Sequence, residues 1–430
     1  MTSASPTSWN LVPRQAAWQA IGLLLRPLHL GIAFPSILYL TALTVFLFRP
    51  PDLDLLYADR IVFFILLFFV ALKFLGARGR IPFLPAISIP MLSLIALSAF
   101  RALREPFDAS TWSLVASKFV VPFVLMHLAI LVFRNPAERR QFSIFLLLAL
   151  AYLVFTSIVF LADARTLIFP RFILDESIGH HVDRARGPFL QAVANGLSLN
   201  MLGILVLVFA RRYRKIVLLL WLALPVAILA TMTRAVWISF AASTVLVSVR
   251  LRDRCLRRAC MAAVLAGVVV FLLIAVNDTS RLNSLYERFN ERGPVDARLA
   301  VYEAGWAMFQ EHPLTGWTAG RMYTELARRM QGYHLSEYYV HNTFLALLVE
   351  FGLPGLLLYG ILLVGLFRLA RADCGGGAVP MGAVSNLRKT WPILLGVFLV
   401  NACFVDMVYQ FVNGLLFTVA GILCASRESA

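Results

Sequence analysis

Charged residues are scarce in this chain of 430 residues and make up only 14% of the sequence. Soluble domains carry about 25% charged residues, so the composition excludes an ordinary water-soluble protein. Hydrophobic residues account for 60%, and the mean hydropathy is +0.79. Apolar windows of about 18 to 20 residues, the length that crosses a bilayer as a helix, recur along the whole chain. We therefore predict an all-α polytopic membrane protein with about 12 transmembrane helices.

The predicted spans lie near residues 31–48, 57–76, 83–100, 112–133, 142–163, 189–210, 216–232, 235–249, 259–276, 353–370, 391–408 and 410–425.

Cysteine is also rare, and we expect no disulfides. We place each of the five cysteines on the cytoplasmic side or inside a span: Cys255, Cys260, Cys374, Cys403 and Cys424. Their spacing does not resemble a metal-binding cluster, so we expect no metal and no other cofactor. No small-residue cleavage site follows the first apolar run, and we expect no removable signal peptide.

Basic residues set the orientation, because loops rich in arginine and lysine stay in the cytoplasm. With the N-terminus inside, the cytoplasmic loops hold Arg78, Arg80, Arg134, Arg139, Arg140, Arg211, Arg212, Arg214, Lys215, Arg250, Arg252, Arg254, Arg257, Arg258, Arg368, Arg371, Arg388 and Lys389. This bias accounts for much of the net charge of +16, so no nucleic-acid partner is needed. A helical bundle indicates an inner or plasma membrane, because outer membranes use barrels.

Two segments predicted outside the membrane are long, residues 164–188 and 277–340. The second contains "VDARLAVYEAGWAMFQEHPLTG" and "MYTELARRMQ", whose apolar spacing predicts two amphipathic helices. We therefore divide the chain into spans 1 to 9 (residues 1–276), an external loop with short helices (277–340), and a final region (341–430). That region comprises a re-entrant or short helix followed by the last spans.

Arginines on the external side are informative because positive charge is disfavoured there in short loops. Arg184 and Arg186 directly precede a span, and Gln191, Asn195 and Ser198 form a polar stripe on its outer turns. Arg234 lies at the outer membrane boundary, because the apolar stretch 216–249 is too short for two full spans with a turn. If these arginines converge they form an anion site, since guanidinium binds phosphate through paired hydrogen bonds. The alternative for Arg234 is a side chain that extends to the membrane surface.

The stretch "YYVHNTFLALLVEFGLPG" contains an apolar segment too short to cross the bilayer. We predict that residues 341–352 enter the membrane only partway and that the GLPG sequence redirects the chain into the span at 353–370. His341 would lie in the first turn, where unpaired backbone N–H groups favour a neutral imidazole, as a general base requires. A structural role for a single interfacial histidine is the alternative.

Four stretches together resemble the motifs of the bacterial O-antigen ligase and polymerase superfamily: "RARGPFLQAVANG", "TRAVW", "RLAVYEAGWAMFQEHPLTGWTAGRM" and "HNTFLALLVEFGLPG". The resemblance covers residues 186–355, departing at Trp317 and in "TRA", where a second small residue and "SRG" are common. It implies a metal-independent, inverting glycosyltransferase of the Gram-negative inner membrane with a periplasmic active site. Such a ligase transfers O-antigen from undecaprenyl pyrophosphate to lipid A-core, completing lipopolysaccharide.

The same resemblance implies residue roles. His341 matches the essential histidine, and the motif arginines are Arg186, Arg234 and Arg298. We expect His341 to act as general base and the three arginines to bind the pyrophosphate. We also expect the protein to contact membrane lipids. The predicted supporting residues are Arg184, Asn195 and Asn342.

Several alternatives remain open. Asp52 and Asp54 form a D-x-D sequence that could hold Mg²⁺ or Mn²⁺ on a pyrophosphate. An O-antigen polymerase or a protein O-oligosaccharyltransferase would share the motifs, and a membrane transporter is the alternative of another class. Asp406 would be the ion site of a transporter, but we interpret it as a partner of one of the arginines. We interpret Glu350 as structural.

Overall fold

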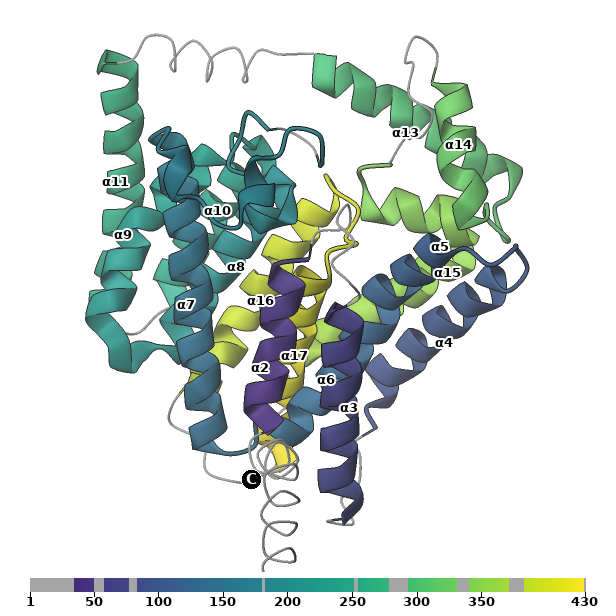
Figure 1. The fold of residues 1–430 in the computed structure, drawn as a ribbon, viewed down its shortest axis with the longest axis horizontal. Coiled ribbons are helices and arrows are strands. Elements are labelled where there is room, and N and C mark those ends of the chain that lie inside the picture. Colours follow the sequence, from purple (N-terminus) through teal and green to yellow (C-terminus); the bar gives the residue numbers. More distant parts are fainter. Residues whose placement is uncertain are drawn as a thin grey trace, which may run out of the picture.

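The computed structural model describes residues 35–49, 58–76, 83–179, 182–250, 254–277, 293–330, 340–370 and 383–428. All regular elements in these residues are helices (Figure 1), which confirms the all-α prediction for this part of the chain. The longer helices are α2 (Pro35–Leu47), α3 (Ala58–Gly76), α4 (Pro85–Ala102), α5 (Ala109–Val115), α6 (Val121–Val132), α7 (Pro136–Leu161), α8 (Ala192–Phe209), α9 (Arg214–Ala230), α10 (Arg234–Arg250), α11 (Arg254–Asn277), α13 (Gly293–Glu311), α14 (Ala319–Arg329), α15 (Thr343–Arg368), α16 (Ala383–Ala402) and α17 (Gln410–Glu428). A π-helical turn, η1 (Ala116–Val120), joins α5 to α6.

Several of these helices could cross a membrane. Six helical stretches within the described ranges are long and apolar enough to span a bilayer. They are Pro85–Ala102, Ala109–Val132, Pro136–Leu161, Ala192–Phe209, Arg211–Ala230 and Thr343–Arg368. Each overlaps a predicted span, so the chain is a membrane protein by length and composition of its helices. The total of about 12 spans and the external position of residues 277–340 stay predictions.

Helix α8 lies at the centre of one half of the bundle, where it packs against α7, α9, α10 and α16. Its residues are almost all buried, because helices cover it on every side. Two of its polar side chains have partners on neighbouring helices. Asn195 donates to the hydroxyl of Ser157 on α7 at 3.1 Å, and Ser243 on α10 donates to Asn200 at 3.0 Å. In the other half, α17 packs along α6.

A second, smaller apolar core lies at one end of the bundle, at the top right in Figure 1. It joins α13, α14 and the beginning of α15. Its buried members are Val301, Ala304, Met308, Met322, Leu326, Met330, Val340, Ala346 and Val349. The two helices predicted from apolar spacing are thus present, and they pack on each other and on the start of α15. The buried side of α13 holds Val301, Ala304 and Met308, whereas Leu299 and Trp306 of the side predicted to be apolar are about half exposed.

An ion pair fastens α14 to the end of α13. Arg329 donates through both terminal nitrogens to the carboxylate of Glu311, each at 2.7 Å. These hydrogen bonds from Arg329 hold the pKa of Glu311 below its ordinary value, and the same bonds raise the pKa of Arg329. The paired geometry is the one in which a guanidinium binds a carboxylate most specifically.

Candidate functional site

Helix α15 is broken at Gly352, whose backbone angles of φ 67° and ψ −165° interrupt the helical geometry. The segment Pro313–Trp317 lies against this break. The N–H of Leu353 donates to the carbonyl of Pro313 at 2.8 Å, and the N–H of Trp317 donates to the carbonyl of Val349 at 2.7 Å. The chain therefore turns within the GLPG sequence, where the sequence predicted it, and a second motif holds the turn in place.

Two glycines allow this close backbone contact. Gly316 and Gly352 both have positive φ, at 63° and 67°. A Cβ atom on Gly316 would lie 2.5 Å from the carbonyl oxygen of Glu350, and one on Gly352 would lie 2.6 Å from that of Pro313. Only glycine combines these angles with this spacing at no steric cost. The sequences PLTG (residues 313–316) and EFGLPG (residues 350–355) thus form the two sides of one junction.

His341 precedes the first segment of α15, with a left-handed φ of 48°. Asn342 caps the helix, because its side-chain oxygen accepts hydrogen bonds from the N–H groups of Phe344 at 3.0 Å and Leu345 at 3.1 Å. The prediction that His341 lies in the first helical turn is therefore wrong. The asparagine occupies the helix end, and the half-buried histidine lies one residue outside it.

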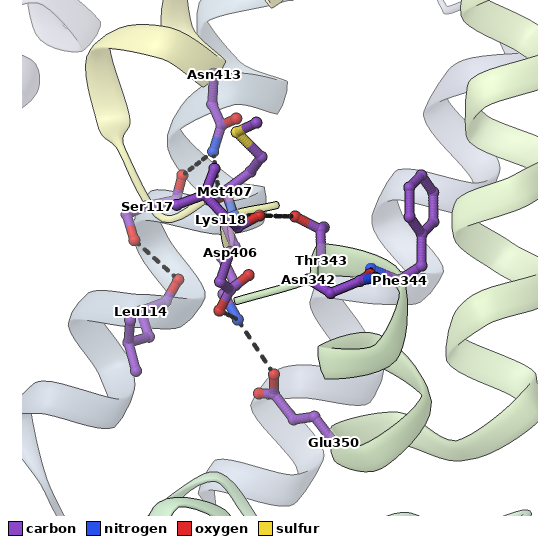
Figure 2. Close-up of polar contacts among 11 residues, drawn as sticks. Leu114, Ser117, Lys118, Asn342, Thr343, Phe344, Glu350, Asp406, Met407 and Asn413 are labelled. Atoms are coloured by element: carbon purple, nitrogen blue, oxygen red, sulfur yellow. Dashed lines mark hydrogen bonds and ion pairs between the residues drawn. The ribbon is translucent and has the colours of Figure 1, made fainter. Parts of the chain in front are cut away.

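The loop between α16 and α17, residues Cys403–Tyr409, contacts the start of α15; we call it the α16–α17 loop. The hydroxyl of Thr343 donates to the carbonyl of Val405 at 2.8 Å and accepts from the N–H of Met407 at 3.1 Å (Figure 2). Asn413 on α17 holds the loop from the other side by donating to the carbonyl of Met407 at 2.8 Å. The residue two positions after His341 is thus bonded to this loop.

Cys403 belongs to the same loop, because α16 ends at Ala402. The helix of this predicted span, which was drawn to residue 408, therefore ends earlier, and the position of Cys403 relative to the membrane stays a prediction. The helix ends earlier because Asn401 turns the chain. Its carbonyl accepts from the N–H groups of Phe404 at 2.9 Å and Val405 at 3.1 Å.

Arg298 on α13 reaches the α16–α17 loop as well. Its guanidinium carbon lies 5.9 Å from the centroid of the Phe404 ring, which is a cation–π contact. One turn along α13, the hydroxyl of Tyr302 donates to the carbonyl of Cys403 at 3.2 Å. Helix α13 and the start of α15 thus meet at neighbouring residues of one loop.

Arg234 approaches from a third direction as the first residue of α10. Helix α10 packs along α16, and Asn401 donates to the hydroxyl of Ser239 at 3.1 Å. Arg234 lies five residues before Ser239, about 7.5 Å along the helix axis. Because Asn401 begins the turn into the α16–α17 loop, Arg234 lies at the same end of the bundle as Arg298 and His341.

Arg186 has a different environment. Its side chain is 1% exposed, and its three nitrogens donate to backbone carbonyls of its own loop. Nε donates to Ile173 at 2.9 Å and one terminal nitrogen to Ile178 at 2.6 Å, while the other donates to Asp175. These contacts hold the loop before α8 together. The predicted pyrophosphate contact of Arg186 stays a prediction.

Two other predicted supporting residues, Arg184 and Asn195, contact the same loop before α8. Arg184 forms an ion pair with Asp183 at 3.5 Å. Asn195, which is fully buried, donates to the carbonyl of Ala185 at 2.7 Å. This segment reaches the α16–α17 loop through Phe189, whose ring centroid lies 6.4 Å from that of Tyr409.

Sequence reasoning missed a buried lysine beneath this site. Lys118 in η1 forms ion pairs with Asp406 at 2.9 Å and Glu350 at 3.3 Å (Figure 2). The interpretation of Asp406 as a partner of an arginine is corrected, because its cation is this lysine. The signal was present in the sequence, since a charged residue in a predicted span is rare and calls for a partner.

The alternative metal site at Asp52 and Asp54 lies outside the residues that the structure describes.

Comparison with known proteins bears on the central part of the chain. Residues 217–360 match the family model described as O-antigen ligase. The resemblance to the O-antigen ligase superfamily predicted from the motifs is thereby confirmed. The match includes Arg234, Arg298 and His341, whereas Arg186 lies before it. The chain has no match among curated proteins.

Proposed function

We propose that this member of the O-antigen ligase superfamily is the ligase itself. In this proposal it transfers O-antigen polysaccharide from undecaprenyl pyrophosphate to lipid A-core on the periplasmic side of the Gram-negative inner membrane. One observation carries the proposal. Arg298 and the segment after His341 contact the α16–α17 loop, and Arg234 begins the helix α10, which packs along α16 and starts at the same end of the bundle. Two guanidinium groups and an imidazole are the groups that transfer from a lipid pyrophosphate requires.

The chemistry assigns a role to each side chain. His341 accepts the proton of an acceptor sugar hydroxyl, whose oxygen then attacks the anomeric carbon of the donor sugar. The bond between that carbon and the pyrophosphate oxygen breaks as the new glycosidic bond forms, so the anomeric configuration inverts. Negative charge grows on the departing lipid pyrophosphate. Arg234 and Arg298 stabilise this charge, because fixed cationic donors in a partly dry site are effective there.

The remaining predicted residues have positioning roles in this proposal. Asn342 caps the helix that follows His341 and so fixes the backbone beside the base. Arg186, with Arg184 and Asn195, organises the loop before α8 and brings Phe189 against Tyr409. Arg234 and Arg298 are the proposed pyrophosphate ligands near the α16–α17 loop, with Arg186 as the predicted third.

The test is transfer in vitro with purified protein, lipid-linked donor and lipopolysaccharide that lacks O-antigen. His341→Ala is expected to abolish transfer while the donor still binds, because the base is lost and the arginines remain. His312→Ala is the matched control, since this exposed ring contacts Trp317 at 4.9 Å between ring centroids, away from the α16–α17 loop. Full transfer by the His341→Ala protein would exclude the assignment.

Two further arms separate mechanisms and reactions. Arg298→Lys is expected to lower transfer although the charge is kept, because lysine lacks the two-pronged geometry. Transfer that survives EDTA supports the arginine mechanism, and loss rescued by Mn²⁺ would favour a metal held by Asp52 and Asp54. In cells lacking the protein, donor should accumulate with no polymer on the core. Single repeat units on the core would instead identify a polymerase.

A further inference from the structure

Lys118 is one of the most deeply buried charges in the described part of the chain. Its side chain is 7% exposed, and its partners Glu350 and Asp406 are 10% and 11% exposed. A buried ammonium group is tolerated only when it is paired, because its transfer out of water is costly. The lysine lies in the π-helical turn η1, and such turns inside helices are frequent at functional sites. Burial of the Lys118 charge costs free energy that its two partners have to offset, so the presence of a lysine at this position calls for an explanation.

The ammonium group connects three elements that are distant in sequence. Glu350 lies on the first segment of α15, Asp406 lies in the α16–α17 loop, and Lys118 lies between them on η1 (Figure 2). Thr343 and Glu350 are seven residues apart, which is about two helical turns and places them on one face of α15. That face is therefore fastened to the loop at two points, directly through Thr343 and indirectly through Lys118.

The two fastening points are neighbours within the loop as well. Thr343 bonds to Val405 and Met407, which flank Asp406 on either side. Rotation or sliding of the loop against α15 would have to break both contacts together. His341 stands two residues before Thr343, and the Arg298 side chain contacts Phe404 two residues before Asp406. The start of α15 and the α16–α17 loop thus form one connected unit. His341 belongs to this unit, and Arg298 contacts it through Phe404.

Arg101 at the end of α4 connects this cluster to the break of α15. It interacts electrostatically with Glu350 and donates to the carbonyl of Thr315 in the segment that holds the break. The two carboxylates beside Lys118 are stable in a buried place only while each keeps a partner. Arg101 is half-buried and also bonds to Thr315, so it does not depend on Glu350 alone.

We infer that Lys118 is a positioning residue for transfer: its ammonium group, held between Glu350 and Asp406, fixes the distance between His341 and Arg298. The predicted effect on transfer rests on the proposed function. The predicted structural effect, that Lys118 holds the α16–α17 loop against α15, does not depend on that function. Lys118 itself does not touch the reacting atoms in this scheme.

The experiment uses the full-length protein in detergent. The variant Lys118→Met/Glu350→Gln/Asp406→Asn removes all three charges while keeping side-chain volume, so no carboxylate is left buried without a partner. We expect kcat per folded molecule to fall about 10²-fold, the effect of a displacement of about 1 Å in a catalytic group, with the donor KM nearly unchanged. A purely structural role would lower the yield of folded protein and leave kcat per folded molecule intact.

Three comparisons make the result decisive. Lys118→Arg should retain more of kcat than Lys118→Gln, because a guanidinium can still bind both carboxylates. Lys215→Met is the matched control for loss of one lysine charge and should leave kcat unchanged. Lys215 is exposed near the start of α9, whereas Arg234 begins α10, after the other end of α9. Hydrogen exchange should become about tenfold faster in residues 343–351 and 403–409 of the triple variant, because the loop is no longer fastened.

The outcomes separate the two proposals. A triple variant with wild-type kcat and wild-type exchange would overturn the role of Lys118. A wild-type protein without transfer activity would overturn the proposed function, while the exchange measurement would still decide whether Lys118 fastens the loop.

Discussion

The break in α15 offers a test in which two glycines of the same helix respond in opposite directions. Gly352→Ala places a methyl group where the backbone has φ 67° and ψ −165°. This region of backbone angles is essentially open to glycine alone and costs other residues about 1–3 kcal/mol. The new Cβ would also lie 2.6 Å from the carbonyl oxygen of Pro313 and 2.8 Å from the carbonyl carbon of Leu314.

The second contribution comes from the segment that must move. Relief of the contact pushes Pro313 away and breaks its hydrogen bond from the N–H of Leu353, which is 2.8 Å long. An unpaired buried backbone group costs about 1–3 kcal/mol. The two contributions together predict a loss of about 2–6 kcal/mol in the junction. Because the first segment of α15 follows His341, transfer should fall as well.

Gly360→Ala is the matched control. Gly360 lies within the second segment of α15, and a Cβ there would meet nothing within 4 Å. Alanine in a helix interior is more stable than glycine by about 0.5–1 kcal/mol, so this variant should unfold at a higher temperature. The measurement is thermal unfolding in detergent together with transfer activity. Equal unfolding temperatures for the two variants would refute the account of the break.

Three further predictions concern individual contacts. Asn342→Ala should destabilise the start of α15 by about 0.5–2 kcal/mol, seen as faster hydrogen exchange at Phe344, whereas Asn342→Asp keeps the capping oxygen and the protection. Arg186→Lys should loosen residues 173–178 by about 1.5–3 kcal/mol for each carbonyl bond that the single ammonium group cannot make, measured by the same exchange; unchanged exchange would contradict the loop-holding role. The Glu311–Arg329 pair should weaken with acid. The pKa of Glu311 is lowered on folding, so its stabilisation is complete above the ordinary glutamate pKa and is lost as the pH falls through the lower, folded value. Protection of α14 from exchange, measured against the intrinsic rate at each pH, should therefore fall on acidification. Glu311→Gln should weaken that dependence on pH, since Glu325 still pairs with Arg329.

Much of the site was visible in the sequence because its motifs carry local constraints. The glycine and proline of GLPG cannot continue a helix in the ordinary way, so the turn near Gly352 was predictable. Apolar spacing likewise predicted α14 and its covered face of Met322, Leu326 and Met330. It predicted the presence of α13 but not which of its sides is covered. The helix limits were harder to predict. His341 was expected inside a helix that Asn342 in fact begins, because hydropathy does not show which of two polar neighbours caps the helix.

Partners across the fold were the part that the sequence did not reveal. Lys118 and Asp406 are separated by most of the chain, and Arg186 was expected to face a ligand although its donors are used by backbone carbonyls. In each case residue type and depth indicated that a partner must exist, because a buried charge demands one.

Sequence alone thus indicated a helical membrane protein, located the break of α15, and predicted one imidazole and several guanidinium groups for the proposed chemistry on a lipid pyrophosphate. Only the tertiary structure brought the start of α15 and Arg298 to the α16–α17 loop and paired a buried lysine with Asp406 of that loop. The physical reason is that hydropathy and backbone preference are local properties, whereas the choice of partner for a buried charge depends on which helices pack side by side.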